Sequence, residues 1–183
     1  MAKKQKTLHD FLIQKIRSAS QKWPETYKIK DRVRVEVRVE YDKSMPDQIT
    51  IHVPQTTCRL ANGEEYIVLN QIIIRKCHKP AQNRNRVMYL CENCKRLFFE
   101  RDWVSVKGVM KDKIMLAADH IEPVVAVTGW VDWNTFFARM FPGDSGLQIL
   151  CNYPGEIGGV ISCHSKKTKE ENSQRKEYRK KTK

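Results

Sequence analysis

The spacing of hydrophobic positions divides the first part of the chain into a helical start and an alternating middle. Apolar side chains recur at helical spacing over residues 7–22 and stop before a Trp-Pro pair, so a helical segment is predicted within residues 1–28. Valines at every second position from 33 to 39 alternate with charged side chains, which is typical of a half-buried strand. Residues 48–53 and 66–75 have the composition of further strands.

Residues 29–80 are therefore predicted to form a small β-rich module. Ala61-Asn62-Gly63-Glu64 has the composition of a hairpin turn inside it. The module carries no evident chemistry, so its role is either core packing or additional contact with, or selection of, a DNA target. A polar stretch over residues 79–86 is typical of a linker to the next domain.

The second predicted domain covers residues 87–172. Residues 114–118 form a short apolar run that predicts a strand ending at Asp119-His120. Aromatic side chains recur at helical spacing over residues 132–141, behind an aspartate suited to cap a helix. We expect these aromatic side chains to pack in the core.

Positive charge is the main feature of the composition. The formal net charge is +13, and residues 165–183 contain nine basic and three acidic side chains. Residues 173–183 are accordingly predicted to form a basic, solvated C-terminal tail. A field of this sign favours nucleic acid partners, although ribosomal, membrane-surface and acidic protein partners would explain the charge equally well.

The distribution of apolar residues bears on the cellular location. No apolar run approaches the ~20 residues of a membrane span, and the first residues lack the apolar core of a signal peptide. We therefore expect a soluble cytoplasmic protein with no membrane partner.

The chain has six cysteines, and two of them form a Cys-x-x-Cys pair at Cys91 and Cys94. In a compartment that keeps thiols reduced, such a pair favours metal binding over disulfide formation. A redox-active pair is the alternative, but the sequence around it lacks a strand-to-helix context of the thioredoxin kind.

Four short segments in a fixed order carry the most specific information: Cys91-Glu92-Asn93-Cys94, Ala118-Asp119-His120-Ile121-Glu122-Pro123, Leu147-Gln148-Ile149-Leu150-Cys151 and Ser162-Cys163-His164-Ser165-Lys166-Lys167-Thr168. This order resembles the HNH endonucleases, most closely the small zinc-containing enzymes common in bacteriophages. The similarity covers about residues 89–171. It implies a zinc-containing ββα-metal domain at the C-terminus. The N-terminal helix and the small β-rich module that precede it are not part of the family pattern, and the whole chain is expected to be of the α+β class.

The resemblance also implies an activity. The chain would be a metal-dependent DNA endonuclease of phage or mobile-element type, which hydrolyses phosphodiester bonds by nicking or cutting double-stranded DNA. It would act in the host cell cytoplasm if it is encoded by a phage, where phage proteins are possible partners.

A structural zinc ion is implied by the cysteines of the resembled family. Cys91 and Cys94 match its first pair, and Cys151 and Cys163 are expected to form the second. The family has Cys-x-x-Cys again in the second pair, whereas this chain has a longer insertion with Pro-Gly and Gly-Gly, which we expect to loop out and return. Cys58 and Cys77-His78 are the spare ligand candidates, with ordinary buried thiols as the alternative.

Three residues match the reacting centre of the family. By this resemblance His120 is the general base that takes a proton from water, and Asp119 and His164 hold a catalytic divalent cation, Mg²⁺ or Mn²⁺. The alternatives are a packed histidine at a strand end for His120 and a fourth zinc ligand for His164. Glu122 is either a supporting carboxylate or a solvent-facing side chain.

One departure from the family bears on activity. The family has an asparagine before Leu-Gln that braces the loop carrying the base, and this chain has Gly146 there. Asn152 is a possible substitute. The alternative function is therefore a catalytically degenerate, zinc-containing DNA-binding protein.

Basic side chains near the C-terminus are expected to contact DNA phosphates without reading the bases. They are Lys166, Lys167, Lys169, Arg175, Lys176 and Arg179.

Overall fold

The structure is a computed structural model. It describes residues 25–42, 44–45, 47–76, 84–106, 108–154, 156–157 and 160–182. The helix predicted over residues 7–22 lies outside these ranges, and so do the spare ligand candidates at positions 77 and 78.

A five-stranded antiparallel sheet dominates the first half of the molecule. Its strands lie in the order β5-β2-β1-β6-β7. Their bounds are β1 (Arg34–Tyr41), β2 (Gln48–Val53), β5 (Gln71–Lys76), β6 (Arg84–Leu90) and β7 (Leu97–Phe99). The sheet thus joins strands from both sides of residues 77–83.

The valine alternation explains which face of this sheet is buried. Val35, Val37 and Val39 point to the core, whereas the charged residues between them are exposed. Ile51 of β2 lies opposite Val39, and Ile73 of β5 lies opposite Ile51, so the apolar face continues across three strands. Burial of these side chains is the main contribution to the stability of the sheet.

Two elements cover the apolar face. Helix α2 (Glu25–Arg32) contributes Ile29, which is fully buried. The hairpin of β3 (Thr56–Arg59) and β4 (Glu65–Val68) contributes Cys58, Leu60 and Val68. The hairpin turn predicted at residues 61–64 connects these two strands, and Gly63 adopts there the positive φ of 86° that favours glycine.

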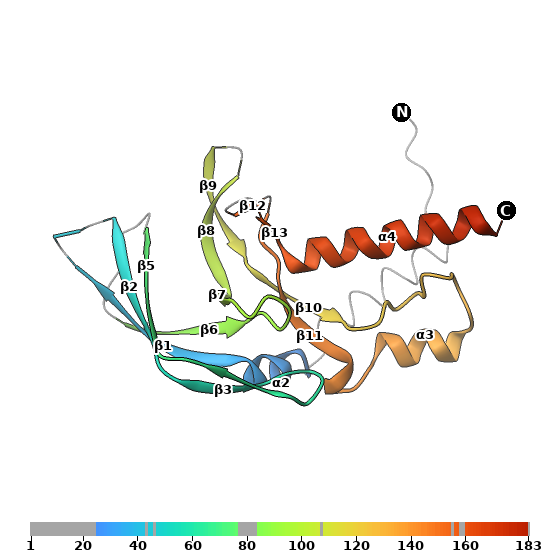
Figure 1. Cartoon of the computed structure of the whole chain (residues 1–183), viewed down its shortest axis with the longest axis horizontal. Coiled ribbons are helices and arrows are strands. Elements are labelled where there is room, and N and C mark those ends of the chain that lie inside the picture. Colours follow the sequence, from blue (N-terminus) through green and yellow to red (C-terminus); the bar gives the residue numbers. More distant parts are fainter. Residues whose placement is uncertain are drawn as a thin grey trace.

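A second hairpin projects from the sheet as a two-stranded ribbon (Figure 1). It consists of β8 (Arg101–Val106) and β9 (Val109–Ile114). Side chains alternate between exposed and half-buried along β8.

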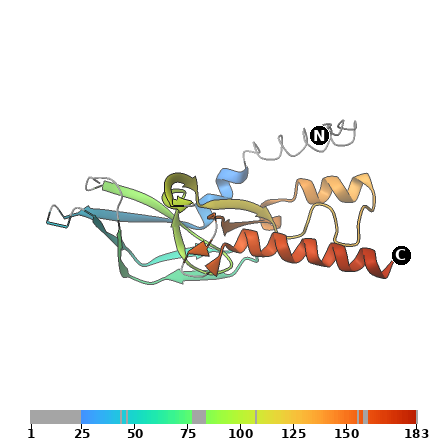
Figure 2. The same ribbon diagram turned by 90° about the horizontal axis from the view of Figure 1, so that it is seen from above.

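The C-terminal part places two helices at the end of the molecule opposite the sheet (Figures 1 and 2). The antiparallel pair of β10 (Leu116–His120) and β11 (Leu147–Cys151) lies between them and the sheet. The chain between these strands forms α3 (Trp133–Met140) and the short 3₁₀ helix η1 (Asp144–Gly146). After β11 come β12 (Glu156–Ile157), β13 (Val160–Ile161) and α4 (Cys163–Lys181).

The predicted fold class is wrong. Strands make up 46% of the described residues, and the large sheet with a C-terminal helix does not fit a ββα-metal HNH fold with an N-terminal helix. The physical reason is that β6 and β7 complete the sheet begun by β1 and β2 and bury Met88, Leu90 and Phe99 in the same core. The four sequence motifs lie in the turn after β6, at the end of β10, along β11 and at the start of α4, so they carry no information about this sheet.

The aromatic side chains of α3 are only partly in the core, in contrast to the prediction. Asp132 caps the helix as expected, accepting a hydrogen bond from the Thr135 backbone N–H at 2.9 Å. Phe136 is buried, but Trp133 and Phe137 are exposed. None of the described helices is long and apolar enough to cross a membrane.

Candidate metal centre and catalytic site

The four cysteines predicted to bind zinc lie together. The Sγ atoms of Cys91, Cys94, Cys151 and Cys163 are all within 4.8 Å of one another. A tetrahedral ion with metal–sulfur distances of ~2.3 Å separates its sulfur ligands by about 3.8 Å. The cluster therefore fits a structural metal ion.

Local backbone structure positions the first cysteine pair. Cys91 and Cys94 lie in a tight turn directly after β6, closed by a hydrogen bond from the Lys95 N–H to the Cys91 carbonyl at 2.9 Å. Lys95 has a positive φ of 59°, which lets the chain reverse and return towards β7. Both sulfurs consequently face the end of β11.

The second pair depends on the long insertion between its members. Cys151 ends β11 and Cys163 begins α4, and the chain between them returns through the short β12–β13 pairing. Tyr153 connects the two sides of this segment to each other and to the sheet. Its hydroxyl donates to the Val160 carbonyl at 3.1 Å, and its ring stacks on Phe98 of β7. The loop therefore returns to its starting point, as the Pro-Gly and Gly-Gly pairs indicated.

Electrostatics within the cluster favour a bound cation. Hydrogen bonds from the Cys151 and Cys94 thiols lower the pKa of Cys91 to about 2, and the same contact with Cys91 raises the pKa of Cys151 far above its usual range. Without a cation to compensate their mutual repulsion, the crowded cysteines cannot all lose their protons and become thiolates. Backbone N–H groups also point at the cluster, from Cys151 to the Cys91 sulfur at 3.3 Å and from Cys163 to the Cys151 sulfur at 3.2 Å.

Glu92, inside the Cys-x-x-Cys segment, holds the cluster against the sheet. Its side chain is only 4% exposed. Its carboxylate accepts from the Ile149 N–H at 2.7 Å, from the Ala61 N–H at 2.5 Å and from the Arg32 guanidinium at 3.3 Å. Sequence reasoning missed this residue, because its partners lie far away along the chain and a glutamate at a turn ordinarily faces solvent.

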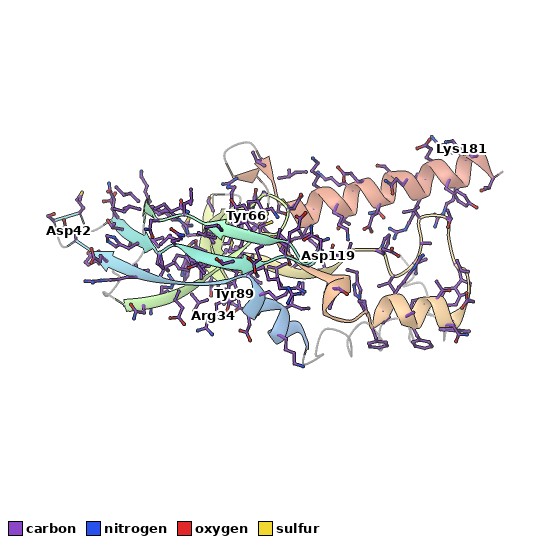
Figure 3. All side chains as sticks on the ribbon, turned by 60° about the horizontal axis from the view of Figure 1, so that its bottom comes forward. Arg34, Asp42, Tyr66, Tyr89, Asp119 and Lys181 are labelled. Carbon is purple, nitrogen blue, oxygen red and sulfur yellow. The ribbon has the colours of Figure 1, made fainter. Side chains whose placement is uncertain are left out.

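Of the three residues predicted to form the reacting centre, Asp119 and His164 lie close together, and His120 follows Asp119 on β10 with its ring towards α3. Asp119 and His120 end β10, and His164 is the second residue of α4. The Asp119 Oδ1 and His164 Nε2 atoms are 3.9 Å apart. Figure 3 places Asp119 where the sheet half of the molecule meets the helices, and Lys181 at the far end of α4.

The orientation of His120 is fixed by a backbone carbonyl. Its Nε2 atom lies 3.0 Å from the Met140 carbonyl oxygen at the end of α3. A carbonyl only accepts, so Nε2 carries the proton in this contact, and Nδ1 keeps the lone pair in the neutral ring.

Lys167 is a further member of the site that the motif did not assign to it. Its ammonium lies 2.6 Å from the Asp119 Oδ2 atom, contacts the His120 carbonyl oxygen, and lies 3.3 Å from Glu171. One carboxylate oxygen of Asp119 thus faces His164 and the other is held by Lys167. The lysine follows His164 by three positions, which places both on one face of α4.

Gly146 stands where the resembled HNH enzymes have an asparagine, and there is no room for a side chain at this position. A Cβ atom would lie 2.2 Å from the Pro142 Cβ atom, so no side chain fits without moving the loop. A main-chain contact links this position to the residue after His120, since the Ile121 N–H donates to the Gly146 carbonyl at 3.0 Å.

The remaining candidates are placed as follows. Cys58 is buried in the main core, where burial raises its pKa, and it lies outside the cluster. Glu122 is exposed and reaches Arg139 at 3.7 Å. Of the six basic residues predicted to contact DNA, Lys167 and Arg175 are engaged within the protein, and the other four are exposed: Lys166, Lys169, Lys176 and Arg179.

The chain was compared with protein-family models, curated proteins and solved structures. None of them matches it.

Proposed function

We propose that this chain is a metal-dependent DNA endonuclease of the HNH kind, which nicks or cuts double-stranded DNA. The observation that carries the proposal is the approach of Asp119 to His164 beside a four-cysteine cluster, with His120 next to Asp119 on β10. These residues come from two elements, the end of β10 and the start of α4, that the cluster holds together through Cys151 and Cys163.

His120 is the general base in this proposal. Its Nε2–H donates a hydrogen bond to the Met140 carbonyl, which orients the ring and leaves Nδ1 as the proton acceptor. Imidazole accepts protons near neutral pH and is the commonest general base in enzymes. The ring therefore has a fixed tautomer suited to taking a proton from an attacking water.

Asp119 and His164 supply the ligands for a divalent cation, with Mg²⁺ and Mn²⁺ as the proposed ions. A carboxylate oxygen and an imidazole nitrogen 3.9 Å apart suit one shared cation after small rotations of the side chains. When bound, such a cation stabilises negative charge on the phosphate. Lys167 fixes the second oxygen of Asp119 and so presents the first towards His164.

The proposed ion of the cysteine cluster is zinc. Four thiolates in tetrahedral reach are the ligand set of structural zinc sites, and such sites contribute directly to folding free energy. Both hypothesised metal sites share the start of α4, so a loss of the structural ion would displace His164.

Helix α4 is the proposed DNA contact. No described residue of it is buried, and its exposed lysines and arginines can approach phosphates. This electrostatic contribution does not depend on base sequence and weakens as salt is added.

Plasmid cleavage tests the proposed activity. The wild-type chain, incubated with supercoiled DNA and Mg²⁺ or Mn²⁺, should produce open-circular or linear product, and His120→Ala should lose this activity. His52→Ala is the matched control, because His52 lies on the large sheet beside Glu40 and outside the candidate site. If wild type and His120→Ala gave equal product, the proposal would be wrong.

One observation favours the second function, a DNA-binding protein without cleavage. The Lys167 ammonium already neutralises Asp119 at 2.6 Å and competes with any cation there. In that case the wild type should retard DNA in a gel-shift assay but produce no cleavage with either metal.

A further inference from the structure

The outer edge of the five-stranded sheet is formed by β5, which carries two exposed isoleucines. Ile72 is 65% exposed and Ile74 is 67% exposed. Among the described residues, β5 pairs with β2 on one side only and has no strand on the other. An edge strand with free backbone groups and apolar side chains is a template for pairing with another strand.

The centre of β5 lacks the usual protection of sheet edges. Edge strands are ordinarily protected by lysine, proline, a bulge or an inward-pointing charge. The centre of β5 consists of three consecutive isoleucines, and Arg75 is engaged by Asp102 and by the ring of Phe99. The centre of the strand therefore presents apolar side chains, and its exposed charge, Lys76, is confined to the C-terminal end.

We propose that β5 is a homodimer interface, in which two copies of this chain pair their β5 strands in antiparallel orientation about a two-fold axis. The proposal does not depend on the nuclease function. It would extend the five-stranded sheet of each copy into one continuous sheet.

The faces of the sheet restrict the register. Ile73 faces the core opposite Ile51, whereas Ile72 and Ile74 lie on the outer face opposite His52 and Thr50. Residues directly opposite each other in an antiparallel pair share one face, so a two-fold pairing must match outer-face positions with each other. Registers centred on Ile72, Ile73 or Ile74 do this. We propose the one centred on Ile73, because it alone sets Ile72 against Ile74 of the second copy at both outer-face pairs.

Apolar burial and charge both favour this register. Four isoleucines, two from each copy, meet on the outer face, where each now lies mostly in solvent. Gln71 lies opposite Arg75 of the second copy, so no like charges face each other in the central strand pair. The strand is thus complementary to itself.

The interface is small. A six-residue strand pair buries less than the ~1,600 Å² of a standard protein interface, so we expect a reversible dimer with a dissociation constant in about the micromolar range. Analytical ultracentrifugation of the full chain over this concentration range should show a monomer–dimer equilibrium.

Charged substitutions test the strand and its register. Ile72→Glu and Ile74→Lys should each weaken dimerisation by about tenfold or more, because each replaces a cross-strand isoleucine pair by a charge against an isoleucine. Mixing the two variants should restore dimers, since Glu at position 72 of one copy then faces Lys at position 74 of the other. Ile114→Lys is the control, because Ile114 is an exposed isoleucine of the β8–β9 ribbon.

Each outcome supports or overturns the proposal. A wild-type chain that stays monomeric throughout the range overturns it, and so do dimers that tolerate both β5 substitutions or are lost equally in Ile114→Lys. Dimers lost in each single variant but not restored by mixing refute the register and with it the proposed pairing. Restoration on mixing supports both the strand and the register.

Discussion

Glu92 offers the sharpest test of how the metal-binding turn is attached to the sheet. Replacing Glu92 by alanine removes three hydrogen bonds: two from backbone N–H groups, at 2.7 and 2.5 Å, and one from Arg32 at 3.3 Å. The two N–H groups would keep no other protein acceptor at that position, and a buried donor left unsatisfied costs ~1–3 kcal/mol. Arg32, at 15% exposure, would also lose its carboxylate partner.

These contributions overlap, so the expected destabilisation is about 3–5 kcal/mol, the range measured when one partner of a buried ion pair is removed. Arg32 keeps its hydrogen bond to the Leu147 carbonyl at 2.9 Å, which favours the lower half of that range. A loss of this size is a large fraction of the ~5–15 kcal/mol that stabilises a typical domain.

Urea unfolding of the zinc-loaded chain, followed by tryptophan fluorescence, measures the difference by linear extrapolation. Glu92→Gln should lose less than Glu92→Ala, because the amide oxygen still accepts one of the backbone hydrogen bonds. Glu65→Ala is the control: Glu65 is exposed on β4, and its loss should change stability by no more than ~0.5 kcal/mol. A loss below ~1 kcal/mol for Glu92→Ala would refute the reasoning.

The other predictions concern metal, DNA and catalysis. Cys163→Ser should release about one zinc per chain and unfold the C-terminal half; full zinc occupancy by metal analysis would contradict this. Deleting residues 173–183 should weaken binding to all DNA sequences alike and reduce its salt dependence, and a changed sequence preference in a binding-site selection would argue otherwise. His120→Ala should lower plasmid cleavage by ~10²–10⁴-fold with Mn²⁺ affinity unchanged, whereas Asp119→Ala should weaken Mn²⁺ binding in calorimetry and regain part of its rate at high Mn²⁺. The reverse pattern would exchange their roles. Lys167→Met should tighten Mn²⁺ binding, because a competing positive charge is removed; weaker binding would mean that the lysine mainly orients Asp119.

Local patterns were sufficient to predict several parts of the structure. The alternation of the β1 valines predicted a strand and its buried face, and Asp132 predicted the start of α3. The four cysteines of the cluster were also predicted. Cys151 and Cys163 depart from the expected spacing, but the insertion between them contains glycine and proline, which indicated a loop that brings the two cysteines together.

Long-range pairings explain what the sequence did not reveal. In the sequence, the residues of β6 indicate only a segment that leads into the Cys-x-x-Cys turn. Their pairing with β1, about fifty residues earlier, makes this segment part of the main sheet. The partners of Glu92 are 31, 57 and 60 positions away along the chain. The sequence predicted that Lys167 contacts DNA. Its contact with Asp119 could not be predicted, because it depends on how α4 packs against the end of β10.

The cysteine cluster also has a consequence for the order in which the nascent chain folds. Cys91 and Cys94 directly follow β6 of the main sheet, whereas Cys163 lies 69 positions after Cys94 and is the last of the four to be translated. A prematurely terminated product that stops before α4 lacks both the last sulfur ligand and His164. Such a fragment keeps the sheet but lacks the complete metal centre and the residues grouped around it.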